Sequence, residues 1–135
     1  MNLEYELGVV FKMILVTLLA GLIGFDRKKR KKPAGIKTHI IVGIASTTFT
    51  ILALLYGSEK GDSNGSKIIS AILSSMGFIG AGTIIKQDKE NLVIGVTTAA
   101  TLWLTSAIGI AVGMGYYTIA IIASVFSFVI LKVLK

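Results

Sequence analysis

The chain has 135 residues, of which 53% are hydrophobic and 16% are charged, and it contains one proline and no cysteine. Its mean hydropathy is +0.80, whereas soluble domains carry about 25% charged residues. A soluble chain this short could hold one modest core, but the apolar residues occur in runs that such a core could not cover. The bilayer is therefore the predicted solvent, and the lack of cysteine excludes disulfides and thiolate chemistry.

Five apolar runs are long enough to cross the hydrocarbon layer, which requires about 20 residues in a helix. No small-residue cleavage site closes the first run, and its positive cluster follows it, so we expect this run to stay in the mature protein. Glycines and tyrosines at 113–117 predict a tight turn between the last two runs. The sequence thus predicts an all-α polytopic membrane protein with a single domain over 1–135 and spans at about 7–25, 38–56, 68–85, 92–114 and 116–134.

The positions of the basic residues predict the orientation of these spans, because lysine and arginine in short loops stay on the cytoplasmic side. With the amino terminus outside and the carboxyl terminus in the cytoplasm, eleven of the 14 basic residues fall on the inner side. The densest run, 27–32, would fix the orientation and attract anionic lipid headgroups. A nucleic-acid patch is the alternative interpretation, but the run lies between spans and has no interleaved aromatic residues. We therefore expect no nucleic-acid partner.

This orientation brings polar residues of several spans to the cytoplasmic leaflet. Ionisable groups at the edge of a span often face a bundle interior or a water-filled cavity and mark a site. The candidate inner-face site comprises Asp26, Arg27, Lys37, Thr38, His39, Thr97 and Thr98. We expect Asp26 and His39 to meet across the basic loop, with His39 as the pH-sensitive member. The alternatives are a weak exposed ion pair for Asp26 and a satisfied packing histidine for His39.

Small residues mark the third and fourth spans. The motif GFIGAG, with Gly77, Gly80 and Gly82, has no strand before it, so close helix packing explains it better than nucleotide binding. In the fourth span, small residues recur every four positions on one helical face, namely Thr97, Thr101, Thr105, Gly109 and Gly113. This face is interpreted as a helix-packing seam, with a hydroxyl-lined path as the alternative.

The stretches GLIGFDRKKRKKPAGIKTHIIVGIAS, SSMGFIGAGTII and GVTTAATLW together resemble the MgtC/SapB family of bacterial and archaeal inner-membrane proteins. Asp26 and Arg27 match an acid-arginine pair of the family, with aspartate where glutamate is common. Lys37 stands where arginine is usual, which loses the planar fork of a guanidinium. The other matching positions are Ala34, Gly35, Thr38, His39, Gly77, Gly80, Gly82, Thr97, Thr98, Ala99, Ala100, Leu102 and Trp103. Many members carry a further cytoplasmic domain, whereas this chain stops at Lys135.

The resemblance implies a compact domain in the cytoplasmic membrane, a link to magnesium limitation and virulence, and inhibition of ATP synthase by the best-known members. We expect a non-enzymatic regulator that contacts another membrane protein, and a homodimer. One histidine and no cysteine leave no general base with a partner for an enzyme. The alternative is a transporter or channel for magnesium or another ion, which would need oxygen ligands along a path. No cofactor is expected, magnesium would enter as a ligand or a signal, and Asp26 would be its ligand.

Overall fold

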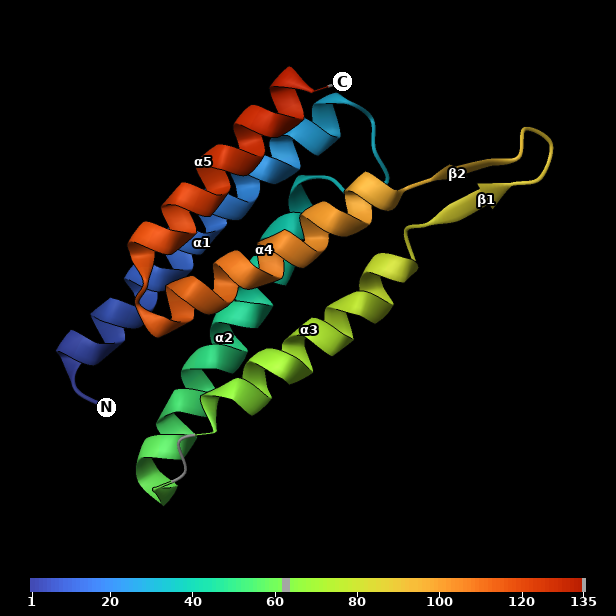
Figure 1. The fold of residues 1–135 in the computed structure, drawn as a ribbon. Helices are drawn as coiled ribbons and strands as arrows, with labels where there is room; N and C mark the ends of the chain where they lie inside the picture. Colours follow the sequence, from blue (N-terminus) through green and yellow to red (C-terminus); the bar gives the residue numbers. More distant parts are fainter. Residues whose placement is uncertain (62–63, 135) are drawn as a thin grey trace.

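The structure, a computed structural model, describes residues 1–61 and 64–134; Lys135, which counted toward the inner charge, lies outside them. Within the described residues, five helices form an elongated bundle in which α4 lies among the others (Figure 1). A two-stranded antiparallel hairpin extends from one end of the bundle, between α3 and α4. In chain order the elements are α1 (Leu3–Lys29), α2 (Ile36–Lys60), α3 (Gly65–Ala81), β1 (Ile85–Gln87), β2 (Leu92–Ile94), α4 (Val96–Met114) and α5 (Tyr117–Val133).

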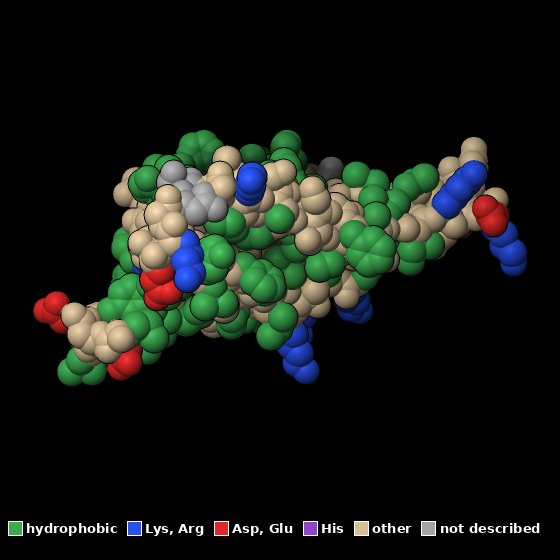
Figure 2. Space-filling model, turned by 90° about the horizontal axis from the view of Figure 1, so that it is seen from below, with side chains coloured by type: hydrophobic (Ala, Val, Ile, Leu, Met, Phe, Trp, Pro, Cys, Tyr) green, Lys and Arg blue, Asp and Glu red, His purple; other side chains and the backbone are tan. Residues whose placement is uncertain are grey.

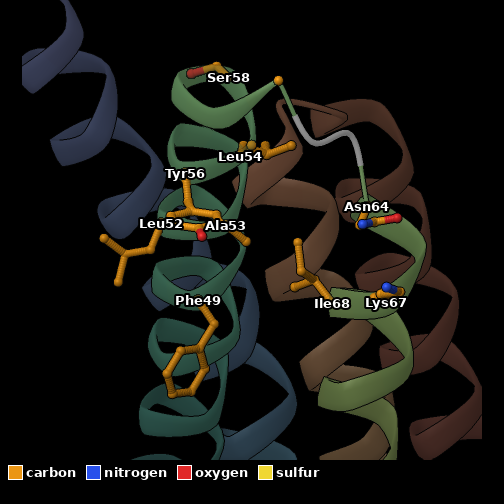
Figure 3. A pocket seen from close by; sticks show the side chains of 12 residues that line it. Phe49, Leu52, Ala53, Leu54, Tyr56, Ser58, Asn64, Lys67 and Ile68 are labelled. Atoms are coloured by element: carbon orange, nitrogen blue, oxygen red, sulfur yellow. The ribbon is translucent and has the colours of Figure 1, made fainter.

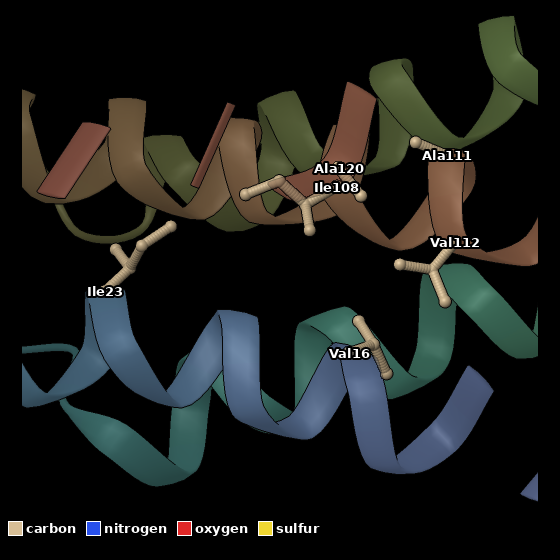
Figure 4. Packing of buried hydrophobic residues seen from close by; sticks show 6 residues of the cluster. All are labelled: Val16, Ile23, Ile108, Ala111, Val112 and Ala120. Carbon is tan, nitrogen blue, oxygen red and sulfur yellow. The ribbon is translucent and has the colours of Figure 1, made fainter. Parts of the chain in front are cut away.

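The core lies on both sides of α4, which contacts each of the other four helices. On one side, Val16 and Ile23 of α1 face the buried side chains of α4 and α5 (Figure 4). On the other side, Val42 of α2 and Met76 of α3 pack with Leu102 of α4. Most residues of the second half of α4 are buried, so this helix holds the bundle together.

Three helices, α1, α2 and α4, are long and apolar enough to cross a membrane, whereas α3 and α5 are apolar but have 17 residues each. At about 1.5 Å per residue, α1 extends about 40 Å and α3 about 25 Å, against about 30 Å of hydrocarbon. On the face shown in Figure 2, hydrophobic side chains are spread over the body among other side chains and backbone, some basic side chains project from it, and acidic side chains lie only toward the two ends. Such a surface is suited to lipid.

The hairpin corrects the expected spans 68–85 and 92–114, because α3 ends at Ala81 and α4 begins at Val96. The all-α expectation therefore holds for the bundle but not for the connection between α3 and α4. Gly95 explains the late start of α4: its φ is +93°, and a Cβ atom there would overlap the carbonyl oxygen of Thr83. Only glycine lets the chain leave β2 and enter the helix so close to that carbonyl.

The first helix is longer than the expected span 7–25. Its amino-terminal end is capped by Asn2, whose side chain accepts a hydrogen bond from the Tyr5 N–H at 2.9 Å. Its last turn carries Arg27, Lys28 and Lys29, whose charges are favourable at a helix carboxyl terminus. As a result, Asp26 and Arg27 lie on the helix and not after it.

The tight turn predicted at 113–117 is confirmed. Helix α4 ends at Met114 and α5 begins at Tyr117. Gly115 between them has a φ of +85°, which favours glycine. The turn folds α5 back against α1 and α4.

Candidate functional site

One end of the bundle gathers the end of α1, the start of α2 and the start of α4; we call residues 26–39 and 95–101 the polar end. Gly24 brings α1 and α2 together there, because a Cβ atom at Gly24 would lie 2.7 Å from the Cα of Ile36. This close approach of two backbones places the side chains of Arg27 and His39 within reach of α4.

Arg27 connects α1 to α4. Its side chain is only 3% exposed, and its Nη2 donates a hydrogen bond to Thr98 Oγ1 at 3.1 Å. Its Nη1 lies 3.9 Å from Asp26 Oδ2. The Nε atom of Arg27 is buried and has no hydrogen-bond partner among the described residues. A guanidinium in this position spans two helices and leaves its buried Nε donor unused.

Asp26 is also 3% exposed, which contradicts the exposed-pair interpretation. Its Oδ1 lies 3.4 Å from Arg30 Nε, one helical turn further along α1. Arg30 in turn donates through Nη2 to the carbonyl oxygen of Leu131 on α5. The sequence reasoning missed Arg30 because it ended the helix at residue 25; a helix continued to residue 30 would have shown the i,i+4 spacing.

His39 lies between α2 and α4 and is fully buried. Its Nδ1 is 2.8 Å from the carbonyl oxygen of Gly35, which can only accept, and its Nε2 is 3.0 Å from Thr101 Oγ1. A neutral imidazole with its proton on Nδ1 satisfies both atoms if the Thr101 hydroxyl donates to Nε2. Thr101 Oγ1 is also 2.8 Å from the carbonyl oxygen of Thr98, so its single proton serves one of two acceptors. This geometry favours the packing-histidine interpretation.

The expected inner-face cluster is divided by the fold. Asp26 and His39 share no hydrogen bond or ion pair within the described residues: the polar contacts of Asp26 are with Arg27 and Arg30, and those of His39 are with Gly35 and Thr101. The buried members of the expected cluster are Asp26, Arg27, His39 and Thr98, and the exposed members are Lys37, Thr38 and Thr97.

The small-residue face of α4 packs against α2. A Cβ atom at Gly109 would overlap Ser46 Oγ and lie 2.7 Å from the carbonyl oxygen of Gly43, and one at Gly113 would lie 2.7 Å from the Cβ of Thr50. Thr101 and Thr105 of α4 are buried, and the Thr105 hydroxyl donates to a carbonyl of its own helix at 2.7 Å. The hydroxyls of Thr101 and Thr105 and the two glycines are therefore in contact with protein, whereas Thr97, at the start of the same face, is exposed.

The glycines of GFIGAG are in different environments. A Cβ atom at Gly80 would lie 3.4 Å from the Cβ of Ala99, so this residue is at the contact of α3 with α4. A Cβ atom at Gly77 would meet nothing within 4 Å. Gly82, which follows α3, is exposed. One of the three glycines thus faces another helix of the bundle.

The charges of the polar end suit an anion better than a cation. Within residues 1–61 and 64–134, no group of three or more His, Cys, Asp or Glu side chains could hold a metal ion. Asp26 has two guanidinium groups within 4 Å, and Lys31 and Lys32 extend the positive charge along the loop that follows α1.

The fold and the polar end define a multi-pass helical membrane protein with a cluster of buried ionic groups at one end. The MgtC family model matches residues 13–135, so the chain belongs to the MgtC family.

Relatives in three bacteria support this assignment. The chain is 34% identical over 129 residues to YhiD of Escherichia coli (strain K12), which is named as a candidate magnesium transporter, with 92% of this chain and 59% of YhiD covered. It is 40% identical over 109 residues to protein MgtC of Brucella abortus (strain 2308), covering 81% of this chain and 44% of the relative. It is 30% identical over 141 residues to protein SrpB of Synechococcus elongatus, covering 96% of this chain and 76% of SrpB. No solved structure matches the chain.

The matched region spans 59% of YhiD and 44% of MgtC. The activities of these longer proteins are therefore not transferred to the chain on similarity alone.

Proposed function

We propose that the chain is a non-enzymatic regulator of the cytoplasmic membrane that acts by direct contact with another membrane protein through helix α3. The observation that carries this proposal is the free face of α3. Only Ile72, Met76 and Gly80 of its 17 residues are buried. The other small-residue face, on α4, is already occupied by α2.

The free face of α3 has the composition of a transmembrane helix contact. It carries Ser70, Ser74, Gly77 and Ala81, which are exposed and recur at spacings of three and four residues. Small residues at such spacings let two helix backbones approach closely in a bilayer. No charged residue lies between Lys67 and Lys86. An apolar transmembrane segment is therefore the partner that this face suits.

A groove beside the same helix adds to this surface. A cavity of about 480 Å³ lies between α2 and α3 and is lined mainly by apolar side chains, including Val42, Phe49 and Ile79. Figure 3 shows a second hollow, of about 880 Å³, where the end of α2 meets the start of α3. Phe49 and Ile68 line both hollows, so the two adjoin along α2 and α3.

The proposal includes five spans, with the polar end in the cytoplasm, and a homodimer as the resting state. The orientation is supported by the position of the basic residues. Arg27–Lys32, Lys86 and Lys89 all lie at the end of the bundle from which the hairpin extends. Attachment of a reporter enzyme after residue 134 tests the orientation. Activity of a periplasm-specific reporter at that position would refute it.

The contact proposal is tested by adding bulk to α3. ATP synthase, the partner implied by the family resemblance, is the first target. We would measure ATP-driven proton pumping in inverted membrane vesicles that contain the wild-type chain, Gly77→Leu or Gly8→Leu. Gly8 is the matched control, because it is also a helical glycine with nothing within 4 Å of an added Cβ atom. We expect inhibition by the wild type and by Gly8→Leu, and loss of inhibition in Gly77→Leu.

Equal inhibition by both variants would refute the role of α3. A wild-type chain without any effect on pumping would refute ATP synthase as the partner. The particle mass of the three proteins in mild detergent then shows whether α3 joins a second copy. A dimer that Gly77→Leu alone dissociates would assign the free face to the homodimer.

Transport of magnesium or another ion is the second proposal, and the name of YhiD is what favours it. Asp26 is the carboxylate on which such a path would depend, although two arginines already neutralise it. Magnesium uptake by proteoliposomes tests this, with Asp26→Ala as the variant. Uptake above that of empty vesicles, lost in Asp26→Ala, would support transport; no uptake by folded protein would reject it.

A further inference from the structure

The polar end contains a cavity that the proposed function does not use. It has a volume of about 450 Å³ and lies between the loop that follows α1 and the start of α4. Arg27 and the two lysines that follow the helix line one side, and the first residues of α4 line the other. The lining residues that matter are Arg27, Lys31, Lys32, Gly95, Thr97 and Thr98.

The start of α4 presents unused donors to this cavity. Gly95 is the N-cap, and in the part of the chain that the structure describes no side chain makes a capping hydrogen bond to this helix. The first hydrogen bond of the helix is the one from the Ala99 N–H to the carbonyl oxygen of Gly95, at 2.9 Å. The N–H groups of residues 96–98 precede it and have no acceptor in their own helix. An anion at this position would also be favoured by the helix dipole.

Arg27 is an independent indication of an anionic ligand. It is 97% buried and lines the cavity, and its Nε has no hydrogen-bond partner within residues 1–61 and 64–134. A buried donor without an acceptor is costly, above all on a charged group. An anion in the cavity would supply the missing acceptor, and a guanidinium suits the oxygen atoms of phosphate.

The two lysines are fixed in place by the backbone. The Lys31 N–H donates to the carbonyl oxygen of Lys28 and the Lys32 N–H to that of Arg27, both at 2.9 Å. This pair of bonds is a Schellman motif, in which glycine is usual at the left-handed position. Lys31 occupies that position with a φ of +56°. The basic run therefore has a defined end that holds two positive charges at the cavity.

Asp26 offsets only part of this charge. It is absent from the cavity lining, and its oxygen atoms lie 3.4 Å from Arg30 and 3.9 Å from Arg27. The single carboxylate is shared by two arginines, so the lining of the cavity stays net positive through Lys31 and Lys32.

We propose that this cavity binds a phosphate group, held by the buried Arg27, the unpaired N–H groups at the start of α4, and Lys31 and Lys32. The phosphate belongs either to a soluble ion or to the headgroup of a phospholipid, since both present the same oxygen atoms. The inference goes beyond contact through α3 and does not depend on it.

The test is equilibrium binding to the purified full chain in a nonionic detergent at constant ionic strength. Inorganic phosphate is one probe, and short-chain phosphatidic acid, compared with phosphatidylcholine, is the other. We would measure the dissociation constants for the wild type, Lys31→Gln/Lys32→Gln, and Lys28→Gln/Lys29→Gln. The last variant is the matched control, because it removes the same charge from exposed residues of the same run that do not line the cavity.

We expect Lys31→Gln/Lys32→Gln to weaken binding about tenfold or more, because each lost contact is a hydrogen bond to a charged group, and Lys28→Gln/Lys29→Gln to change it less than about threefold. Arg27→Gln should weaken binding at least as much. If this variant does not fold, the comparison of the two lysine variants still tests the proposal, because all four lysines are exposed. If Lys31→Gln/Lys32→Gln weakens the binding of inorganic phosphate, the ligand is a soluble ion. If this variant weakens the binding of phosphatidic acid alone, the ligand is a lipid headgroup. Equal weakening by both lysine pairs, or no binding of either probe, would overturn the proposal.

Discussion

Helices α3 and α4 both carry rows of small residues, yet the fold uses the two rows differently. On α4, Gly109 and Gly113 lie so close to α2 that an added methyl group would overlap or closely contact it. On α3, a Cβ atom added at Gly77 would meet no atom of another described element within 4 Å. Small-residue spacing thus indicates that a helix can be approached closely, but it does not say whether the approaching helix belongs to the same chain.

Gly109→Leu is expected to have the largest effect. The side chain would collide with Ser46 and with the carbonyl of Gly43 on α2, and backbone cannot move aside as a flexible side chain can. We expect a loss of about 4 kcal/mol or more, in the range seen for severe overpacking. Unfolding in mixed detergent micelles measures it, with Gly8→Leu as control. Equal stability of the two variants would mean that α2 and α4 are not in close contact.

His39→Ala comes next and tests the polar part of the contact between α2 and α4. The change removes the hydrogen bonds to Gly35 and Thr101 and opens a cavity at a fully buried position. We expect a loss of about 3 kcal/mol in the free energy of unfolding. Thr38→Ala, at the exposed neighbouring position, should stay within about 0.5 kcal/mol. A similar loss in both variants would argue against a specific role of the imidazole.

Thr98→Val tests the link between α1 and α4. Valine keeps the shape of threonine but removes the oxygen that accepts from Arg27 Nη2 at 3.1 Å. We expect a loss of about 2 kcal/mol, as for a hydrogen bond to a charged group. Thr97→Val removes a hydroxyl from an exposed position one residue away and should cost far less. The free energies of unfolding of the two variants, measured under the same conditions, test this prediction. An equal loss of stability in both would contradict the link between α1 and α4.

Replacing a glycine by alanine is expected to change the stability least, and with opposite signs on α3 and α4. Gly77→Ala should stabilise the chain by about 0.5–1 kcal/mol, because alanine is the better helix former and the added methyl meets open space. Gly113→Ala should destabilise it, because its Cβ would lie 2.7 Å from the Cβ of Thr50. Melting temperatures of the two variants test the comparison directly. The same sign for both would show that the two rows do not differ as described.

The bundle was largely predictable, because helix length and apolar composition are local properties that a run of residues carries by itself. The turn at Gly115 was predictable for the same reason. The hairpin at 85–94 was not, because Ile85 and Leu92–Ile94 adjoin the apolar runs of α3 and α4, and such short apolar pieces favour helix and strand alike. The position of Gly95 beneath the carbonyl of Thr83 decides between them, and that contact exists only in the folded chain.

The sequence by itself determined the apolar helices, the tight turn, and the placement of the acid, the histidine and the threonine pair at one end of the bundle. Tertiary structure alone decided which of these groups meet. Asp26 pairs with Arg30 because α1 continues past residue 25, and His39 bonds to Thr101 because two glycine-lined helices approach closely. Periodicity fixes the face of a helix on which a residue lies, but the neighbour of that face depends on how the whole chain packs.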